Sequence, residues 1–283
     1  MYGTLGTRYH FNQSFGRRGE RAISLPNISL EQLAAEVSNG ATVGLGGAGL
    51  QRKPMAAARA LARAGRRDLK LVSFLGSLDV ELLVAAGCVG ELHSAGVSLD
   101  GAGLAPHYRA ARQGQTLTFV EWSEGTLLCA LQATARGVPS LPTWMALDTD
   151  LPALNPHLRE AQDPFTGARV MQVRALALDV AILHAPAVDA HGNVYVEGDL
   201  AIDGTLARAA QRVYVCHEGV VAADPRRAVL SRIWVDALVP APRGAWPTGC
   251  HSEYGPDLPA VSRWASEGAD GDLQLLTPKG SAR

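Results

Sequence analysis

The chain has 283 residues, of which 47% are hydrophobic and 19% are charged, so it can bury a sizeable core. Its 26 basic and 27 acidic residues give a net charge of −1, which argues against nucleic acid or an anionic membrane surface as a partner. No apolar run approaches the ~20 residues needed to cross a bilayer.

The N-terminal region changes from a polar segment to a capped helix. The first twenty residues are polar and glycine-rich and lack the apolar run of a secretory signal, so we expect a loose tail over residues 1–22. Ser29 and Gln32 then have the spacing of a capping box, which predicts a helix over 30–37 that ends before Gly40. The segment 41–47 is apolar and predicts a buried strand.

Helical and extended patterns alternate through the rest of the first half. This alternation predicts a parallel sheet with helices on both faces. Helices are expected at 55–65, 78–87, 105–114 and 124–137, and strands at 69–75, 89–97 and 116–121.

The second half has a different character. Residues 139–165 contain five prolines and are interpreted as an excursion over the surface. A strand, a turn and a second strand are expected over 179–198, a helix and a strand over 205–216, and a late strand and a loop rich in Pro and Gly over 234–257. No linker divides the chain, so we expect one α/β domain over residues 23–276, with an open, mostly parallel sheet, followed by a tail over 277–283.

The cysteines and histidines show no metal-binding pattern. Cys88, Cys129, Cys216 and Cys250 are far apart and fit no zinc spacing, and the eight histidines form no H-E-x-x-H motif. We therefore expect reduced thiols, no metal site and a cytoplasmic location.

The stretch "ATVGLGGAGLQRKPM" contains three glycines with the dinucleotide spacing G-x-G-x-x-G, at Gly44, Gly46 and Gly49. A dinucleotide fold also needs a helix that begins within the motif and an acid at the end of the second strand. Here the helix is expected to begin only at Pro54, and the second strand is followed by Gly76-Ser77. A nicotinamide site is therefore disfavoured.

The glycine loop has two other interpretations. Glycines allow close approach of a ligand and leave amides free to face it, and Arg52 and Lys53 follow at once. This combination suits a phosphate, a carboxylate or a developing oxyanion. A tight turn with two solvated bases fits the residues equally well.

Four motifs occur in the order found in the alpha subunits of class I coenzyme A transferases, which the chain resembles. They are "GLGGAGLQRKPM", "SEGTLLCALQATARGVPSLP", "DVAILHAPAVDAHGNVYVEGD" and "APRGAWPTGCHSEYGPD". The glutaconate CoA-transferase type is the most similar, and "RKPM" also resembles the alpha subunit of a steroid-ring-cleaving hydrolase. The resemblance covers nearly the whole chain after the tail.

The resemblance implies an open α/β fold and a homologous beta subunit in a hetero-oligomer of α2β2 type. In the transferases a beta-subunit glutamate attacks the acyl-CoA thioester, and an acyl–glutamyl anhydride and a glutamyl–CoA thioester follow. The Glu-Asn-Gly element that carries this glutamate does not occur in this sequence. We therefore expect the chain alone to be inactive. No permanently bound cofactor is implied, and the CoA thioester is a substrate together with a small carboxylic acid.

The resemblance also assigns residues. It implies that Gly46, Gly47 and Gly49 line the acyl-CoA pocket and that Arg52 and Lys53 hold phosphate or carboxylate. We expect the loop amides to receive negative charge from the thioester carbonyl. We expect bulk at Gly47 to harm catalysis more than folding, provided that its φ suits an ordinary residue.

Glu124 is the candidate catalytic residue, since a glutamate in this element acts in the hydrolase relatives. As a general base it would need a pKa raised by burial, for which Trp122 could supply an apolar wall. Its alternative role is that of an acidic residue in the first turn of a helix, where the macrodipole favours it. One departure from relatives is Trp144, which stands where they often have an arginine.

Three functions follow from these residues. The first is CoA transfer between an acyl-CoA and a carboxylic acid. The second is hydrolytic carbon–carbon ring opening of a cyclic acyl-CoA in steroid or aromatic catabolism, and the third is a non-catalytic subunit that completes a partner's active site.

Overall fold

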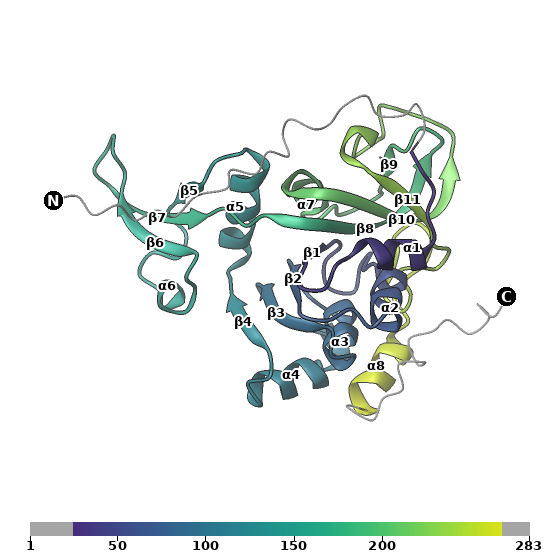
Figure 1. Cartoon of the computed structure of the whole chain (residues 1–283), viewed down its shortest axis with the longest axis horizontal. Helices are drawn as coiled ribbons and strands as arrows, with labels where there is room; N and C mark the ends of the chain where they lie inside the picture. The colour runs from purple at the N-terminus through teal and green to yellow at the C-terminus, as the bar shows by residue number, and fades with distance from the viewer. Residues whose placement is uncertain (1–24, 268–283) are drawn as a thin grey trace.

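The computed structural model describes residues 25–267. The two predicted tails lie outside this range, and so do residues 23–24 and 268–276 of the expected domain. An eight-stranded sheet forms the centre of the molecule (Figure 1). Its strands are β1 (Thr42–Leu45), β2 (Leu69–Ser73), β3 (Val89–Ser94), β4 (Thr118–Glu121), β8 (Leu178–Asp189), β9 (Val194–Tyr195), β10 (Ala210–Val221) and β11 (Ala237–Pro240).

The strand order is β11-β10-β8-β1-β2-β3-β4, and all neighbours in it are parallel. Only β9 differs, because it pairs with β8 in the antiparallel direction. The predicted open, mostly parallel sheet is therefore confirmed. The chain moves from β1 outward to β4, then returns to the other side of β1 and moves outward from β8 to β11.

Helices cover both faces of this sheet and define two cores. The strand β8 serves both, because Val180 and Ile182 belong to the core with α1, α2, α3 and α8, whereas Ala181 and Leu183 belong to the core with α5 and α7. The helices are α1 (Leu30–Glu36), α2 (Met55–Arg63), α3 (Leu78–Ala85), α4 (Pro106–Gln113), α5 (Glu124–Ala135), α7 (Asp203–Ala209) and α8 (Leu258–Glu267). Short 3₁₀ turns occur at Asp100–Ala102 and Arg232–Trp234.

The predicted helix start at Ser29 is confirmed in detail. The Ser29 hydroxyl accepts from the Gln32 amide at 3.2 Å, and the Gln32 side chain accepts from the Ser29 amide at 2.8 Å. Both bonds satisfy amides that the first turn of a helix leaves unpaired. None of the helices between residues 25 and 267 combines the length and the apolar character that crossing a bilayer requires.

The prediction of a surface excursion over 139–165 is wrong in part, because the segment contributes to a second sheet. This sheet is antiparallel and has the order β5-β7-β6, formed by β5 (Ser140–Thr143), β6 (Leu158–Gln162) and β7 (Arg169–Arg174), with α6 (Leu151–Leu154) beside it. It projects from the main sheet (Figure 1). The most exposed large apolar side chains in this part of the chain are Trp144 at 77% and Phe165 at 94%.

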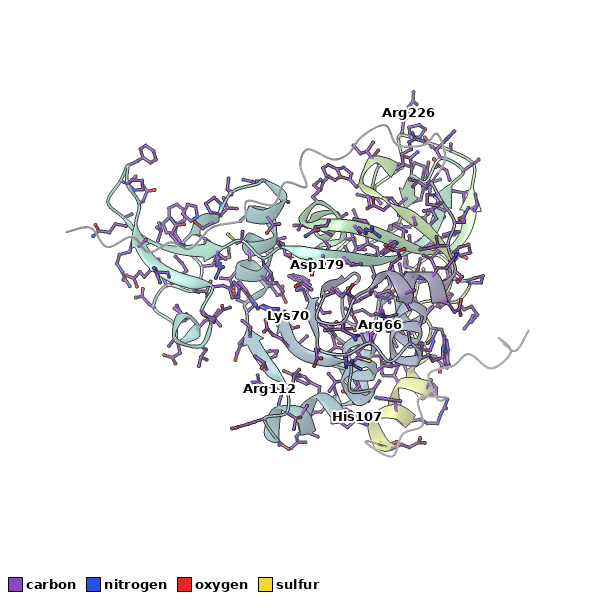
Figure 2. The ribbon with its side chains drawn as sticks, viewed as in Figure 1. Arg66, Lys70, His107, Arg112, Asp179 and Arg226 are labelled. Carbon is purple, nitrogen blue, oxygen red and sulfur yellow. The ribbon has the colours of Figure 1, made fainter. Side chains whose placement is uncertain are left out.

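The buried carboxylate of Glu81 explains how two peripheral helices are held. Its oxygens accept from the backbone amides of His107 and Tyr108, at 2.8 and 2.9 Å, and from the His107 ring at 2.7 Å. It thereby caps the first turn of α4, which has no capping side chain of its own. The indole nitrogen of Trp264 in α8 lies 3.3 Å from the same carboxylate. Figure 2 labels His107 beside these helices.

Candidate active site

The glycine loop lies where the strand order changes direction. Ligands of open α/β sheets bind beyond the carboxyl ends of the strands at such a point. Here the change occurs between β1 and β8, and the loop follows β1 directly. The amide of Gly46 donates to the Ile182 carbonyl of β8 at 3.0 Å, so the loop starts against the neighbouring strand.

The conformation of the loop requires glycine at Gly47. Its φ is +70°, and a Cβ atom there would lie 2.6 Å from the Arg52 carbonyl oxygen and closer still to that of Gln51. Real Cβ atoms do not approach backbone this closely. The prediction that bulk at Gly47 harms catalysis more than folding required a φ that an ordinary residue can adopt. The φ of Gly47 is not of this kind, so a larger side chain there damages the fold first. The helix α2 begins at Met55, one residue after the predicted start at Pro54, which is its N-cap.

The expectation that the loop amides are free is wrong. The Gly47 amide donates to Asp203 Oδ1 at 2.9 Å, the Ala48 amide to the Gln51 carbonyl at 3.1 Å, and the Gly49 amide to the Leu75 carbonyl at 3.1 Å. Together with Gly46, all four amides of the Gly46–Gly49 segment have partners inside the chain. Since each N–H has one hydrogen to donate, these amides form no oxyanion hole in this conformation.

The Arg52 side chain is 2% exposed and faces the interior. Its guanidinium contacts Asp203 Oδ2 at 2.5 Å and donates to the carbonyls of His184 at 3.2 Å and Asp199 at 2.7 Å. Asp203, at the start of α7, thus accepts from both Arg52 and the Gly47 amide. This ion pair fixes the loop after β1 to a helix that comes more than a hundred residues later.

Lys53 is also internal, with an exposure of 0%. Its Nζ lies 3.4 Å from Asp79 Oδ2, 3.2 Å from the Ser73 hydroxyl and 3.3 Å from the Gly47 carbonyl. Asp79, itself fully buried, lies in the first turn of α3. The structure therefore gives both cations internal partners that position the loop. That either cation contacts a ligand stays a prediction.

A pocket of about 560 Å³ opens beside the glycine loop. It lies at the carboxyl ends of β1 and β2 and extends to α8. Its lining is mostly apolar and includes Gly49, which was predicted to line a ligand pocket, but neither Arg52 nor Lys53. The lining residues are Ala48, Gly49, Leu50, Gln51, Leu75, Asp100, Gly101, Ala102, Pro256, Leu258 and Ser262.

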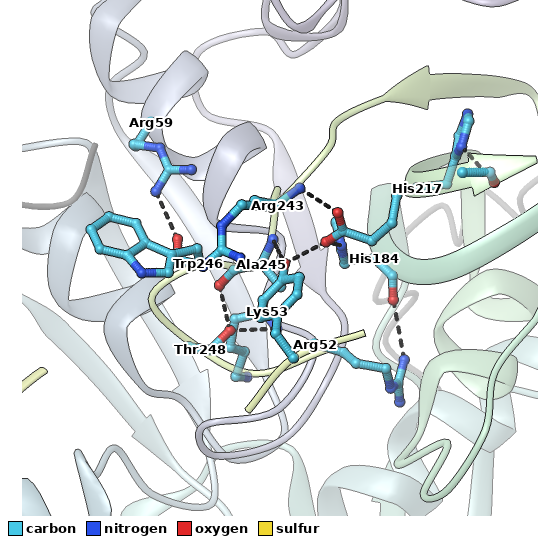
Figure 3. Close-up of polar contacts among 12 residues, drawn as sticks. Arg52, Lys53, Arg59, His184, His217, Arg243, Ala245, Trp246 and Thr248 are labelled. Atoms are coloured by element: carbon cyan, nitrogen blue, oxygen red, sulfur yellow. Dashed lines mark hydrogen bonds and ion pairs between the residues drawn. The ribbon is translucent and has the colours of Figure 1, made fainter. Parts of the chain in front are cut away.

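A second polar network joins β8 and β10 to the loop after β11. His184 Nε2 and Glu218 Oε1 are 2.9 Å apart, and the Tyr254 hydroxyl and the Arg243 amide donate to the same carboxylate. Figure 3 shows His184 and Arg243 in this arrangement. Burial raises the pKa of the Glu218 carboxyl, but the hydrogen bonds from His184 and Tyr254 outweigh it, so the pKa lies below its usual value.

His184, Glu218 and Cys250 are the group of described residues that could hold a metal ion, since their ligand atoms lie within 4.8 Å of one another. Burial, with the nearby Glu218, raises the pKa of Cys250 to about 12, so its sulfur is a thiol in this network. The Glu218 carboxylate already accepts hydrogen bonds from protein donors. A hydrogen-bonded network therefore accounts for this group, and the absence of a metal site stays a prediction.

Glu124 begins α5 just beyond the carboxyl end of β4, and it is exposed. The capping box of this helix is made by Ser123 and Thr126, whose hydroxyls pair with each other's backbone amides at 3.2 and 3.1 Å. Within the described residues the Glu124 carboxylate has no hydrogen bond or ion pair of its own. Hydrogen bonds of a helix cap therefore do not explain why a glutamate stands at this position. The helix dipole still favours a negative charge there.

Polar contacts join Trp122, two residues before Glu124, to the strand β3. The buried indole of Trp122 donates to His93 Nδ1 at 3.1 Å, and His93 Nε2 lies 2.6 Å from Glu91 Oε1. Burial lowers the pKa of His93, which fits a neutral ring that accepts at one nitrogen and donates at the other. The indole of Trp122 therefore donates a hydrogen bond in addition to any apolar contact that it makes. The sequence around Trp122 did not predict this hydrogen bond.

The predicted turn around Gly192-Asn193 is confirmed. Asp189 Oδ1 accepts from the amides of His191 and Asn193, both at 2.9 Å, and Oδ2 accepts from the Asn193 side chain and the Tyr195 hydroxyl. Although burial opposes it, these hydrogen bonds lower the pKa of Asp189. The element serves the fold of the β8–β9 hairpin.

Comparison with known proteins identifies the family. A family model described as Coenzyme A transferase matches residues 27–241, and the chain belongs to this family. It is similar to the cholesterol ring-cleaving hydrolase IpdA subunit of Rhodococcus jostii, with 35% identity over 81% of this chain and 82% of the relative.

Two similar solved structures are named for two further reactions. The decarboxylase AibA/AibB is 37% identical with a TM-score of 0.83, and the match covers 90% of this chain and 98% of that one. Glutaconate coenzyme A-transferase from Acidaminococcus fermentans is 25% identical with a TM-score of 0.82, covering 88% and 85%. Proteins similar to this chain therefore carry out transfer, hydrolysis and decarboxylation.

The steric effect of a side chain at Gly47 can be tested by comparing Gly→Ala substitutions at Gly47 and at Gly65. Both have positive φ, but a Cβ atom at Gly65 meets nothing within 4 Å. We expect Gly65→Ala to lose about 1–2 kcal/mol from the left-handed backbone alone. We expect Gly47→Ala to lose clearly more in urea unfolding, because the chain must also move away from the Gln51 and Arg52 carbonyls. Equal losses would contradict the steric argument.

The buried Lys53–Asp79 pair predicts a large loss of stability when one partner is removed. We expect Lys53→Met to lower the free energy of unfolding by about 3–5 kcal/mol, because Asp79 is left buried without its cation. Lys70→Met, the same exchange at an exposed position of β2, is the control and should change it by less than about 0.5 kcal/mol. Adding Asp79→Asn to Lys53→Met should restore part of the loss, and a fully stable Lys53→Met would refute the role of the pair.

The lowered pKa of Glu218 predicts a pH-dependent contribution to stability. Because the folded pKa lies below the usual value of 4.5, the carboxylate stabilises the fold above that pH, and the contribution disappears as pH falls through the folded pKa. We expect Glu218→Gln to lower the Tm at pH 7 and this difference to narrow below about pH 4. A difference that is constant with pH would show that shape alone matters at Glu218.

Proposed function

We propose that this member of the coenzyme A transferase family is the alpha subunit of a two-subunit enzyme that acts on acyl-CoA thioesters. Two similar proteins support this, since the Rhodococcus relative is named as a subunit and the decarboxylase is named as a pair. The partner is a beta subunit of similar fold. It covers the carboxyl edge of the sheet, where the pocket and Glu124 lie.

We further propose that the reaction is hydrolytic cleavage of a carbon–carbon bond in a cyclic acyl-CoA, with Glu124 as the general base. The observation that carries this proposal is the unpaired, exposed Glu124 carboxylate at the carboxyl edge, on a helix start held by its own capping box. The similarity to the ring-cleaving hydrolase subunit supports it.

The step begins with a water molecule whose proton passes to Glu124 while its oxygen bonds to a ring ketone carbon two atoms from the thioester carbonyl. The carbon–carbon bond between that carbon and the thioester α-carbon then breaks. Its electron pair is delocalised into the thioester carbonyl as an enolate, and the α-carbon takes a proton back from Glu124. The product is a ring-opened acyl-CoA with a new carboxylic acid, and the carboxylate base is regenerated.

CoA transfer is the second candidate, and the family model and the glutaconate CoA-transferase structure favour it. Transfer uses a glutamate nucleophile from the partner and leaves Glu124 without a covalent role. The two reactions are distinguished by a glutamyl–CoA thioester on the partner, which mass spectrometry of the complex incubated with acyl-CoA detects. Its presence favours transfer, and its absence during turnover favours hydrolysis.

We expect Glu124→Gln in the assembled complex to lower kcat for ring opening by about 10²-fold or more, because the water loses its base. The Kd of the acyl-CoA and the Tm should change little, since Glu124 has no structural partner within the described residues. Glu121→Gln, which neutralises an exposed glutamate at the end of the adjoining strand, is the control. Full activity in Glu124→Gln would exclude Glu124 as the base and leave transfer or a non-catalytic role.

A further inference from the structure

The side chain of Met145 lies directly against the helix turn that carries Glu124. Met145 belongs to the loop that follows β5, and its sulfur occupies the space that a Cβ atom of Gly125 would take. Its Cε and Cγ atoms lie 3.1 and 3.6 Å from the same position. Because Gly125 is the residue after Glu124, this contact joins the loop to the first turn of α5.

Glycine leaves the first turn of α5 less restrained than another residue would. Gly125 has no side chain to limit the rotation of its backbone, and Glu124 takes its orientation from this turn. The capping box of Ser123 and Thr126 fixes the two ends of the turn. The thioether of Met145 covers Gly125 between these ends, so it restrains the part of the turn that the capping bonds do not reach.

The loop that carries Met145 is anchored in the protein. The Met145 amide donates to the Thr143 hydroxyl at 3.2 Å, and Leu147 packs against the core that contains α5. Arg169 of β7 donates to Asp148 in the same loop at 3.0 Å. The strands β5 and β7 lie beside α5 (Figure 1). The projecting sheet therefore fixes the loop relative to the helix that begins at Glu124.

We propose that Met145 is a positioning residue for Glu124. By filling the space beside Gly125, its side chain holds the first turn of α5, and with it the Glu124 carboxylate, in the orientation that the reaction requires. This inference rests on the proposed function, since it takes Glu124 to be the general base. Met145 itself exchanges no proton and forms no bond with the substrate. The projecting sheet acts in catalysis through this contact, because it carries the loop that places Met145.

The contact predicts that substitutions at Gly125 and Met145 compensate for each other. Gly125→Ala puts a methyl group where the Met145 sulfur lies, so the side chain or the turn must move. Met145→Ala leaves the turn uncovered. In the double variant the new methyl group occupies the vacated space, and alanine itself favours the helix. Leu154→Ala shortens an apolar side chain that is 61% exposed on α6 and is the control.

Hydrogen exchange measures the restraint on the turn without any substrate. The amides of Thr126 and Leu127 donate to the hydroxyl and the carbonyl of Ser123, so their exchange reports opening of this turn. In the assembled complex we expect Met145→Ala to exchange these two amides about fivefold or more faster than the wild type. The double variant and Leu154→Ala should exchange them at close to the wild-type rate.

Catalysis is measured with 2-oxocyclohexane-1-carbonyl-CoA, a cyclic acyl-CoA with the ring ketone that the proposed step requires. We expect Met145→Ala and Gly125→Ala each to lower kcat by about fivefold or more, because a misplaced base slows the reaction. The Kd of the acyl-CoA should stay near its wild-type value. The double variant should recover to within about threefold of the wild type. In a Glu124→Gln background, Met145→Ala should lower kcat no further, because the group that it positions is absent.

Three results would overturn the positioning role while leaving Glu124 as the base. They are unchanged exchange in Met145→Ala, losses of kcat that simply add in the double variant, and an equal effect of Met145→Ala with and without Glu124→Gln. A wild-type complex that binds this acyl-CoA but does not open its ring, together with faster exchange in Met145→Ala, would instead refute the proposed reaction and retain the restraint on the turn.

Discussion

The ion pair between Arg52 and Asp203 is the constraint on which the rest of the candidate site depends. Asp203 accepts from the guanidinium and from the Gly47 amide, so one buried carboxylate holds both ends of the loop after β1. Because breaking a buried pair leaves an uncompensated charge, the loop has little freedom to adopt another shape. The wall of the pocket formed by Gly49 and Leu50 is fixed as a result.

The pairing of Arg52 and Lys53 with buried carboxylates also determines the charge of the surface at the carboxyl edge of the sheet. Arg52 and Lys53 are the two cations nearest the glycines in sequence, and both are neutralised inside the protein. The carboxylates of Asp100 and Glu124 remain unpaired within the described residues at the carboxyl edge. The surface at this edge therefore offers a carboxylate that can act as a base.

Local sequence patterns predicted the parts of this structure that depend on neighbours in the chain. The capping box at Ser29, the late start of α2 and the turn at Gly192-Asn193 all follow from residues within a few positions of one another. The partners of Arg52 and Lys53 could not be predicted in this way. Asp203 and Asp79 are remote from them in sequence, and no periodic pattern links these positions. The small sheet was missed because prolines obscured its short strands, and α8 because its apolar face is buried by contacts from distant elements.

The division between buried and exposed charge also explains how one family supports several reactions. Transfer, hydrolysis and decarboxylation occur among proteins similar to this chain, with TM-scores of 0.82 and 0.83 for two of them. Buried ion pairs fix the backbone, and exchanging them costs stability. Exposed positions such as Glu124, Asp100 and Trp144 carry little of the fold, so they can change without unfolding it. The scaffold can therefore keep its fold while the side chains at the exposed carboxyl edge change with the reaction.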